Sequence, residues 1–251
     1  MSNRVNVPAP LTVDEVSRLG TVMSVWAHPD DEAYLAGALL AAVTDAGHRA
    51  VCVTATRGEA ADPSAGPGRR TALAARRSRE MEAALGVLGV TEHHWLDLPD
   101  GGCAETDPEG PVSRLLSLLD EVRPDTLVTF GPDGFTGHPD HCAVSGWVDL
   151  ALSRWEGTTT LLHPVVTADE LGRDAALDED YGVYQLGRPR VVAPGDLRVH
   201  LDLDGELLDR KVAALVCQQS QTAALISEVG MARYRSWVAI EMLASPETEF
   251  G

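Results

Sequence analysis

Short apolar segments typical of β-strands alternate along most of this chain with segments of helical composition. Gly89 stands where a helix C-cap is expected, and Pro124 follows the end of another helical segment. The strand-like segments span 21–27, 48–56, 93–98, 126–130 and 158–166, and the helical ones span 31–46, 71–88, 111–122 and a stretch beginning near Pro139. This alternation predicts an α/β fold with a mostly parallel sheet and helices on both faces.

The last third of the chain is less regular. Residues 196–203 alternate polar and apolar side chains, which predicts a strand at a sheet edge or with one solvated face. Residues 207–226 predict one long helix. Because no repeat, low-complexity tract or linker divides the sequence, we expect one domain over residues 1–251.

Composition excludes several classes of partner. The chain has 20 basic and 38 acidic residues, a formal net charge of −18, and such a field repels nucleic acids and anionic lipid surfaces. Its longest apolar candidate, residues 33–43, is far too short to span a membrane, and the N-terminus has no apolar signal-peptide region. The four cysteines are scattered without a CxxC pair. We therefore expect a cytoplasmic protein with reduced thiols, without nucleic-acid or membrane partners.

Two clusters of histidine and carboxylate follow predicted strands. His28–Glu32 (HPDDE) follows the first strand, and His138–His141 (HPDH) follows the fourth after a glycine-rich turn. In a parallel sheet both strand ends lie at one edge, so the clusters are expected to meet. Two imidazoles and a carboxylate suit a zinc site with an open position, and a second carboxylate can act as a base. The alternative is that Asp30 and Asp31 merely cap the following helix.

With these motifs the chain resembles the LmbE-like/PIG-L family of metal-dependent N-acetylglucosamine deacetylases. The resemblance extends from about residue 20 to about 222 and includes Arg57–Glu59, Arg77–Glu80, Asp100–Gly101 and Lys211–Gln221. It implies a Rossmann-like α/β fold. It also implies hydrolysis of an N-acetyl or related acyl group on an amino sugar or sugar-bearing small molecule.

The resemblance also implies roles for individual residues. His28, Asp31 and His141 would bind one zinc ion, or another divalent transition metal, and Asp30 would be the general base on the zinc-bound water. His138 would polarise the carbonyl group or protonate the leaving amine.

Two further residues are implied as contacts of the sugar. These are Arg77 and Asp100, although other alignments put Arg76 or Asp97 there. Family substrates include thiol-cofactor precursors, glycolipids, chitooligosaccharides and natural products. The lysine-poor, arginine-rich composition is typical of a high-GC bacterium, in which a mycothiol-type precursor or a secondary metabolite is the expected partner. A homo-oligomer is compatible with the sequence.

Two positions depart from the family pattern. Thr136 stands where some relatives have tyrosine, and Gln218 stands where a histidine is usual. These departures leave open a catalytically altered protein that binds or regulates. A non-haem Fe(II) oxygenase is a second alternative, since two histidines and one carboxylate also describe that metal triad.

A loop is expected between the second strand and the next helix. Residues 62–70 (DPSAGPGRR) contain two prolines and two glycines, which predict a mobile rim at the edge that carries both motifs. Arg69 or Arg70 would then be available to a polar or anionic substrate group.

Overall fold

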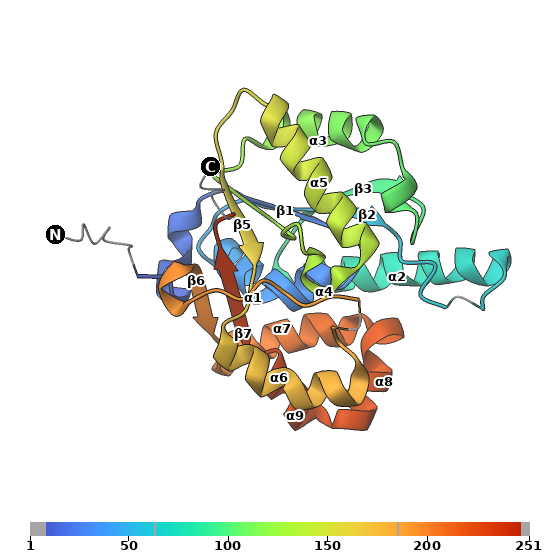
Figure 1. The fold of residues 1–251 in the computed structure, drawn as a ribbon, viewed down its shortest axis with the longest axis vertical. Helices are drawn as coiled ribbons and strands as arrows, with labels where there is room; N and C mark the ends of the chain where they lie inside the picture. Colours follow the sequence, from blue (N-terminus) through green and yellow to red (C-terminus); the bar gives the residue numbers. More distant parts are fainter. Residues whose placement is uncertain (1–8, 63, 185, 247–251) are drawn as a thin grey trace.

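The computed structural model describes residues 9–62, 64–184 and 186–246, and its centre is one seven-stranded sheet in the order β3-β2-β1-β4-β5-β7-β6 (Figure 1). The strands are β1 (Val22–Trp26), β2 (Ala50–Thr56), β3 (Glu92–Leu98), β4 (Thr126–Thr129), β5 (Thr160–Pro164), β6 (Leu197–Asp202) and β7 (Ile240–Ala244). The α-helices are α1 (Asp31–Asp45), α2 (Pro67–Leu88), α3 (Glu109–Val122), α4 (Gly134–Gly137), α5 (Pro139–Arg154), α6 (Ala168–Tyr181), α7 (Gly205–Cys217), α8 (Gln219–Val229) and α9 (Met231–Trp237). Three 3₁₀ segments complete the described part, η1 (Val13–Leu19), η2 (Cys103–Glu105) and η3 (Pro194–Asp196).

The first five strands are parallel and confirm the expected α/β fold. β1 pairs with both β2 and β4, and all five of its residues are buried, as its continuous apolar sequence requires. β6 lies at the sheet edge, and its side chains alternate between buried and less buried, as its sequence predicted. β7 was not predicted. It pairs antiparallel with β5 and β6, so its first residues lie beyond the carboxyl end of β5.

Helices cover both faces of the sheet. In Figure 1, α3 and α5 lie on one side of the strands, and α1, α2 and α7 lie on the other. α3 is typical of how they pack, because its buried residues, such as Leu115, Leu118, Leu119 and Val122, recur at three- and four-residue spacing on one stripe. Within the described ranges, no helix is both long enough and apolar enough to cross a bilayer.

Two predicted segments are wrong in detail. The expected loop at 62–70 is shorter, because α2 begins at Pro67, a residue that is favourable at the first helical position. The long helix expected at 207–226 is two helices, since Gln218 has a non-helical ψ of 49° between α7 and α8. Residue 63 of the loop lies outside the described residues.

Candidate metal centre

The turn after β1 presents the first motif at the carboxyl edge of the sheet. Asp30 has a φ of 110°, a backbone conformation that is strained for a residue with a side chain. The backbone N–H of His28 donates to Asp31 Oδ2 at 2.8 Å, and that of Asp30 donates to Glu32 Oε2 at 3.0 Å. The Asp30 side chain makes no capping hydrogen bond to the described backbone of α1, so capping does not explain this carboxylate.

The second motif follows β4 and positions His141. Its ring stacks on Phe130, with centroids 4.0 Å apart and planes at 11°. His141 Nδ1 lies 2.9 Å from the carbonyl oxygen of Gly134. Because a carbonyl can only accept, Nδ1 carries the proton and Nε2 presents a lone pair. Gly134 has a φ of 64°, and a Cβ there would lie 2.8 Å from Cys142 Sγ, so the turn requires glycine.

The two motifs meet, and three ligand-type groups converge. His28 Nδ1 lies 3.2 Å from His141 Nε2 and 3.7 Å from Asp31 Oδ2. Asp31 Oδ1 lies 3.4 Å from His141 Nε2. These distances suit three ligands of one shared cation: the lone pair of His141, the carboxylate of Asp31 and the second imidazole nitrogen, from His28. Zinc prefers such a set of donors. The ligand atoms of His28, His138 and His141 also lie within 4.8 Å of one another.

The other nitrogen of His28 faces two carboxylates. His28 Nε2 lies 3.1 Å from Asp100 Oδ1 and 3.2 Å from Asp140 Oδ2. Burial by itself would lower the pKa of His28, but the bonds to Asp100 and Asp140 and the charge of Asp31 outweigh it and raise this pKa to about 10. Nε2 therefore keeps its proton, and Nδ1 is the nitrogen that can bind a metal.

Asp140 is a site residue that the sequence reasoning did not assign. Its side chain is fully buried and accepts the backbone N–H groups of Gly101 at 2.8 Å and Cys103 at 3.0 Å. Burial by itself would raise its pKa, but the bonds from His28 and from these N–H groups lower the pKa of Asp140 to about 2. Its place between His138 and His141 in the HPDH motif was the signal that could have identified it.

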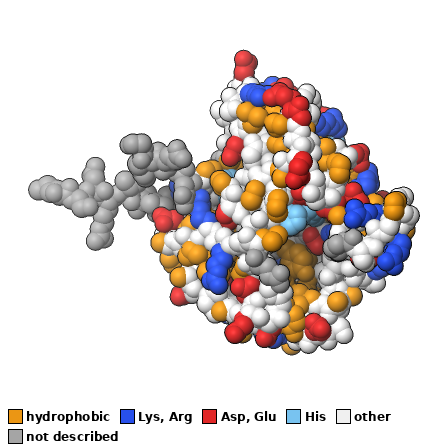
Figure 2. All heavy atoms as spheres, turned by 45° about the vertical axis from the view of Figure 1, so that its right-hand side comes forward, with side chains coloured by type: hydrophobic (Ala, Val, Ile, Leu, Met, Phe, Trp, Pro, Cys, Tyr) orange, Lys and Arg blue, Asp and Glu red, His pale blue; other side chains and the backbone are white. Residues whose placement is uncertain are grey.

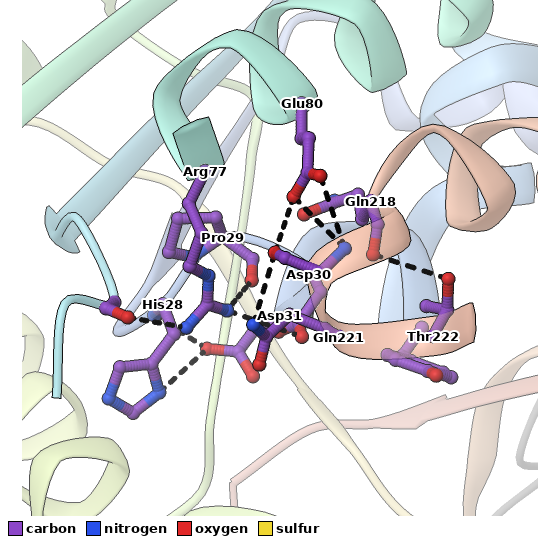
Figure 3. A network of polar contacts seen from close by, with 12 residues as sticks. His28, Pro29, Asp30, Asp31, Arg77, Glu80, Gln218, Gln221 and Thr222 are labelled. Carbon is purple, nitrogen blue, oxygen red and sulfur yellow. Dashed lines mark hydrogen bonds and ion pairs between the residues drawn. The ribbon is translucent and has the colours of Figure 1, made fainter. Parts of the chain in front are cut away.

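Asp30 pairs with a buried arginine beside the cluster of ligands. Its carboxylate lies 3.4 Å from Arg77 Nη2, and burial raises the pKa of Asp30 to about 7 although the charge of Arg77 lowers it. Behind it, Glu32 is fully buried and accepts a bond from Gln218 Nε2 at 2.6 Å through its second oxygen. Gln218 lies at the junction of α7 and α8 (Figure 3). It contacts Glu32, which in turn holds the Asp30 turn.

His138 and Thr136 lie at the rim of the cluster. The His138 ring is 4.8 Å from that of His28, and His138 Nδ1 accepts the backbone N–H of Asp140 at 3.2 Å. Burial lowers the pKa of His138, so at neutral pH its single ring proton is on Nε2. The Thr136 hydroxyl lies 3.4 Å from His141 Nδ1.

The sequence left alternatives for the residues that contact the sugar, and the structure brings Arg77 and Asp100 to the cluster. Arg77 is 4% exposed, and it donates to the carbonyl groups of Pro29 at 2.5 Å and Gly58 at 2.9 Å (Figure 3). Asp100 contacts His28, as described above. Arg76 and Asp97 instead have half-exposed or exposed side chains, which pair with Glu80 and Arg57. Arg77 thus holds the turn that carries Asp30.

The fold and this cluster define an α/β protein with a histidine–carboxylate cluster, a candidate metal centre, at the carboxyl edge of its sheet. A family model described as GlcNAc-PI de-N-acetylase (PIG-L) matches residues 23–152. The chain belongs to this family.

Curated relatives agree with that assignment, and a solved structure agrees with the fold. The chain is 34% identical over 166 residues to a 1D-myo-inositol 2-acetamido-2-deoxy-alpha-D-glucopyranoside deacetylase of Kineococcus radiotolerans, covering 55% of this chain and 46% of the relative. It is 32% identical over 223 residues to the protein with the same description from Streptomyces avermitilis, covering 76% and 70%. The chain spans about half the length of the first two curated relatives it matches, with 46% and 49% covered. A triple mutant of a deacetylase of the teicoplanin biosynthetic pathway aligns with a TM-score of 0.65 and 20% identity, covering 92% of this chain and all of that one, and this likeness shows the fold.

Proposed function

We propose that the protein is a metal-dependent deacetylase that hydrolyses the N-acetyl or a related N-acyl group of an amino sugar carried by a small molecule. Zinc is the proposed ion, held by His28, Asp31 and His141. The observation that carries the proposal is the convergence of these three side chains within 3.2 to 3.7 Å, with the Asp30 carboxylate of the same turn beside Arg77. When bound, a divalent ion polarises a carbonyl group and acidifies water.

The remaining chemistry falls to the side chains. Asp30, with its pKa raised to about 7, is suited to accept a proton from the attacking water near neutral pH. His138 keeps its single ring proton on Nε2, from which it can donate a hydrogen bond to the carbonyl oxygen, and the proton that Asp30 accepts can pass to the departing amine. Asp140 orients His28 through Nε2.

Family membership supports hydrolysis rather than the oxygenase alternative. The arrangement also weakens the case for a catalytically silent protein. Gln218 contacts Glu32 rather than the ligand cluster, so its departure from the family histidine leaves the proposed base and ligands in place. Thr136 offers a hydroxyl group beside His141, which is the side of the cluster where relatives have tyrosine.

The proposal is tested by amine release. Chelator-treated protein is reconstituted with zinc, and with iron(II) for comparison, and offered N-acetylglucosamine and the inositol glycoside named for the relatives. We expect primary amine and acetate in equal amounts, dependent on zinc and lost in Asp30→Asn. If zinc-loaded protein released no amine from any N-acylated amino sugar, the proposal would be wrong.

A further inference from the structure

A mostly apolar cavity of about 300 Å³ adjoins the proposed metal centre. Asp31, Thr136 and His141 line it at the centre. Its other walls come from α1, β5, β7 and α9 and include Leu35, Val165, Trp237, Ile240 and Met242. Figure 2 shows a hollow in which a histidine side chain is visible, with hydrophobic side chains gathered below it.

The order of the strands places this cavity on one particular side of the centre. β2 and β3 lie on one side of β1, and their ends carry polar groups such as Arg57 and Asp100. β4, β5 and β7 lie on the other side, where the cavity is. Arg77, Asp30 and Asp100 are not among its described lining residues. The proposed metal ligands therefore separate a polar region from an apolar one.

The acidic and phenolic groups in the cavity walls are already paired within the protein. Glu241 is 2% exposed, accepts the backbone N–H groups of Ala38 and Leu39 at 2.8 and 2.9 Å, and lies 2.8 Å from Lys211 Nζ. Tyr34 accepts a hydrogen bond from the Tyr234 hydroxyl at 2.8 Å. Because Glu241 and Glu170 are paired with basic side chains and the rest of the wall is mostly apolar, the cavity suits a mainly apolar occupant.

We propose that this cavity is a subsite for the acyl chain of the substrate. It selects N-acyl groups that are longer than acetyl, with up to about ten carbons, since about ten groups the size of a water molecule would fill the cavity. The inference rests on the proposed function, because it assumes that an N-acyl amide is cleaved at the centre. A sugar needs hydrogen-bonding partners, so the amine side of the amide lies toward β2 and β3, and the acyl side enters the cavity. An acetyl methyl group would leave most of this apolar volume unfilled.

The test is a chain-length series with a positional isomer. The probes are N-acetyl-, N-butanoyl-, N-hexanoyl- and N-octanoylglucosamine, and octyl 2-acetamido-2-deoxyglucoside, which carries its chain on the sugar instead. Amine release by the zinc-loaded full chain gives kcat/KM. We expect kcat/KM to rise by about two- to fourfold per methylene from acetyl to hexanoyl, since each buried methylene contributes about 0.8 kcal/mol. The octyl glycoside should be hydrolysed no faster than N-acetylglucosamine.

Matched tryptophan variants locate the effect. Val183 lines the cavity, whereas Leu186, three residues later, is 64% exposed and is not among the lining residues. Val183→Trp should reduce the ratio of hexanoyl to acetyl hydrolysis at least tenfold. Leu186→Trp should leave the ratio unchanged. Competitive inhibition by hexanoate and by acetate provides a second readout, in which hexanoate should bind more tightly.

The outcomes separate the subsite from the proposed function. A flat or falling chain-length series, a gain confined to the octyl glycoside, or an unchanged ratio in well-folded Val183→Trp would overturn the subsite while the deacylase activity stands. If no amide in the series is hydrolysed, the proposed function fails. The subsite is then judged by the quenching of tryptophan fluorescence, and binding of hexanoate no tighter than that of acetate would overturn it too.

Discussion

The two sides of the proposed metal centre differ in the side chains that form them. On the β2–β3 side, Arg57 bonds to Asp97 and lies 4.4 Å over the Trp95 ring, and Asp100 bonds to His28. On the β5–β7 side the walls are aliphatic and aromatic, and the carboxylate of Glu241 is neutralised from behind. The centre lies between β1 and β4, where the strand order reverses, which is where ligands bind in open α/β sheets. The proposed catalytic residues thus lie at the reversal point of the strand order. The polar side and the apolar side are each suited to bind a different half of a substrate.

The largest effect is expected at the centre, which both sides share. His141→Ala removes one proposed ligand and should abolish metal binding, with a loss of kcat/KM of about a thousandfold or more. The loss should be equal for short and long acyl chains. Metal content by mass spectrometry and folding by circular dichroism check this, with His200→Ala on β6 as control. Full metal content in His141→Ala would contradict the ligand assignment.

The next largest effects are expected for Asp30 and Asp31, which have different proposed roles. Asp30→Asn should keep the metal and lower kcat by about a hundredfold or more, as the loss of a general base does. Asp31→Asn should instead lose metal, since Asp31 is the residue that faces both histidines. Metal content and kcat are measured on both variants. Identical behaviour would show that the two residues do not have separate roles.

Proton competition at His28 makes zinc binding depend on pH. In the metal-free protein the pKa of His28 is raised to about 10 from an ordinary value of 6.5, so its contribution to stability is complete below pH 6.5 and is lost as the pH rises through 10. Zinc must displace that proton, so the rise in Tm caused by zinc should grow between pH 6.5 and 9. A zinc-induced rise that is constant or falls over this range would contradict the assignment.

Asp140→Asn tests the cause of that dependence. Loss of this carboxylate should lower the pKa of His28 and weaken zinc binding by about ten- to a hundredfold, as the loss of an outer-shell partner does. Titration calorimetry in buffers of different ionisation enthalpy reports both affinity and proton release. Unchanged affinity would mean that Asp140 serves only the Gly101 and Cys103 backbone.

A smaller effect is expected behind the centre. Gln218→Ala leaves one oxygen of the buried Glu32 without its partner and should cost about 1 to 3 kcal/mol of unfolding free energy. Because Glu32 holds the Asp30 turn, kcat should fall by about tenfold with metal retained. The control is Gln221→Ala, which removes another partly buried glutamine side chain, from α8. Loss of stability without loss of kcat would reduce Gln218 to a structural role.

The smallest effect is expected on the polar side. Arg57→Ala removes an ion pair whose side chains are 35% and 64% exposed, so stability should change by less than about 1 kcal/mol. KM should rise by about three- to fivefold, equally for every acyl length, if this side binds the sugar. A change in KM that depends on acyl length would contradict the proposal that the β2–β3 side binds the sugar and the cavity binds the acyl group.

Local pattern in the sequence was enough to predict the parallel part of the fold and the meeting of the two motifs. β1 to β5 are short apolar runs that follow one another with intervening helices, and this order places His28 and His141 at one edge. The start of α2 and the break at Gln218 were missed, because a helix boundary depends on contacts outside the segment. Gln218 leaves the helical conformation where its side chain reaches Glu32 on α1.

The sequence by itself determined that the two histidine–aspartate motifs meet at one edge of the sheet, since strand ends and the spacing of histidine and aspartate are local properties. Only the tertiary structure decided how they are supported and what lies beside them. Asp140 became part of the site through backbone groups of Gly101 and Cys103, and the apolar cavity exists because β7 returns antiparallel beside β5. Such features require contacts between distant segments, and no periodicity within one segment encodes them.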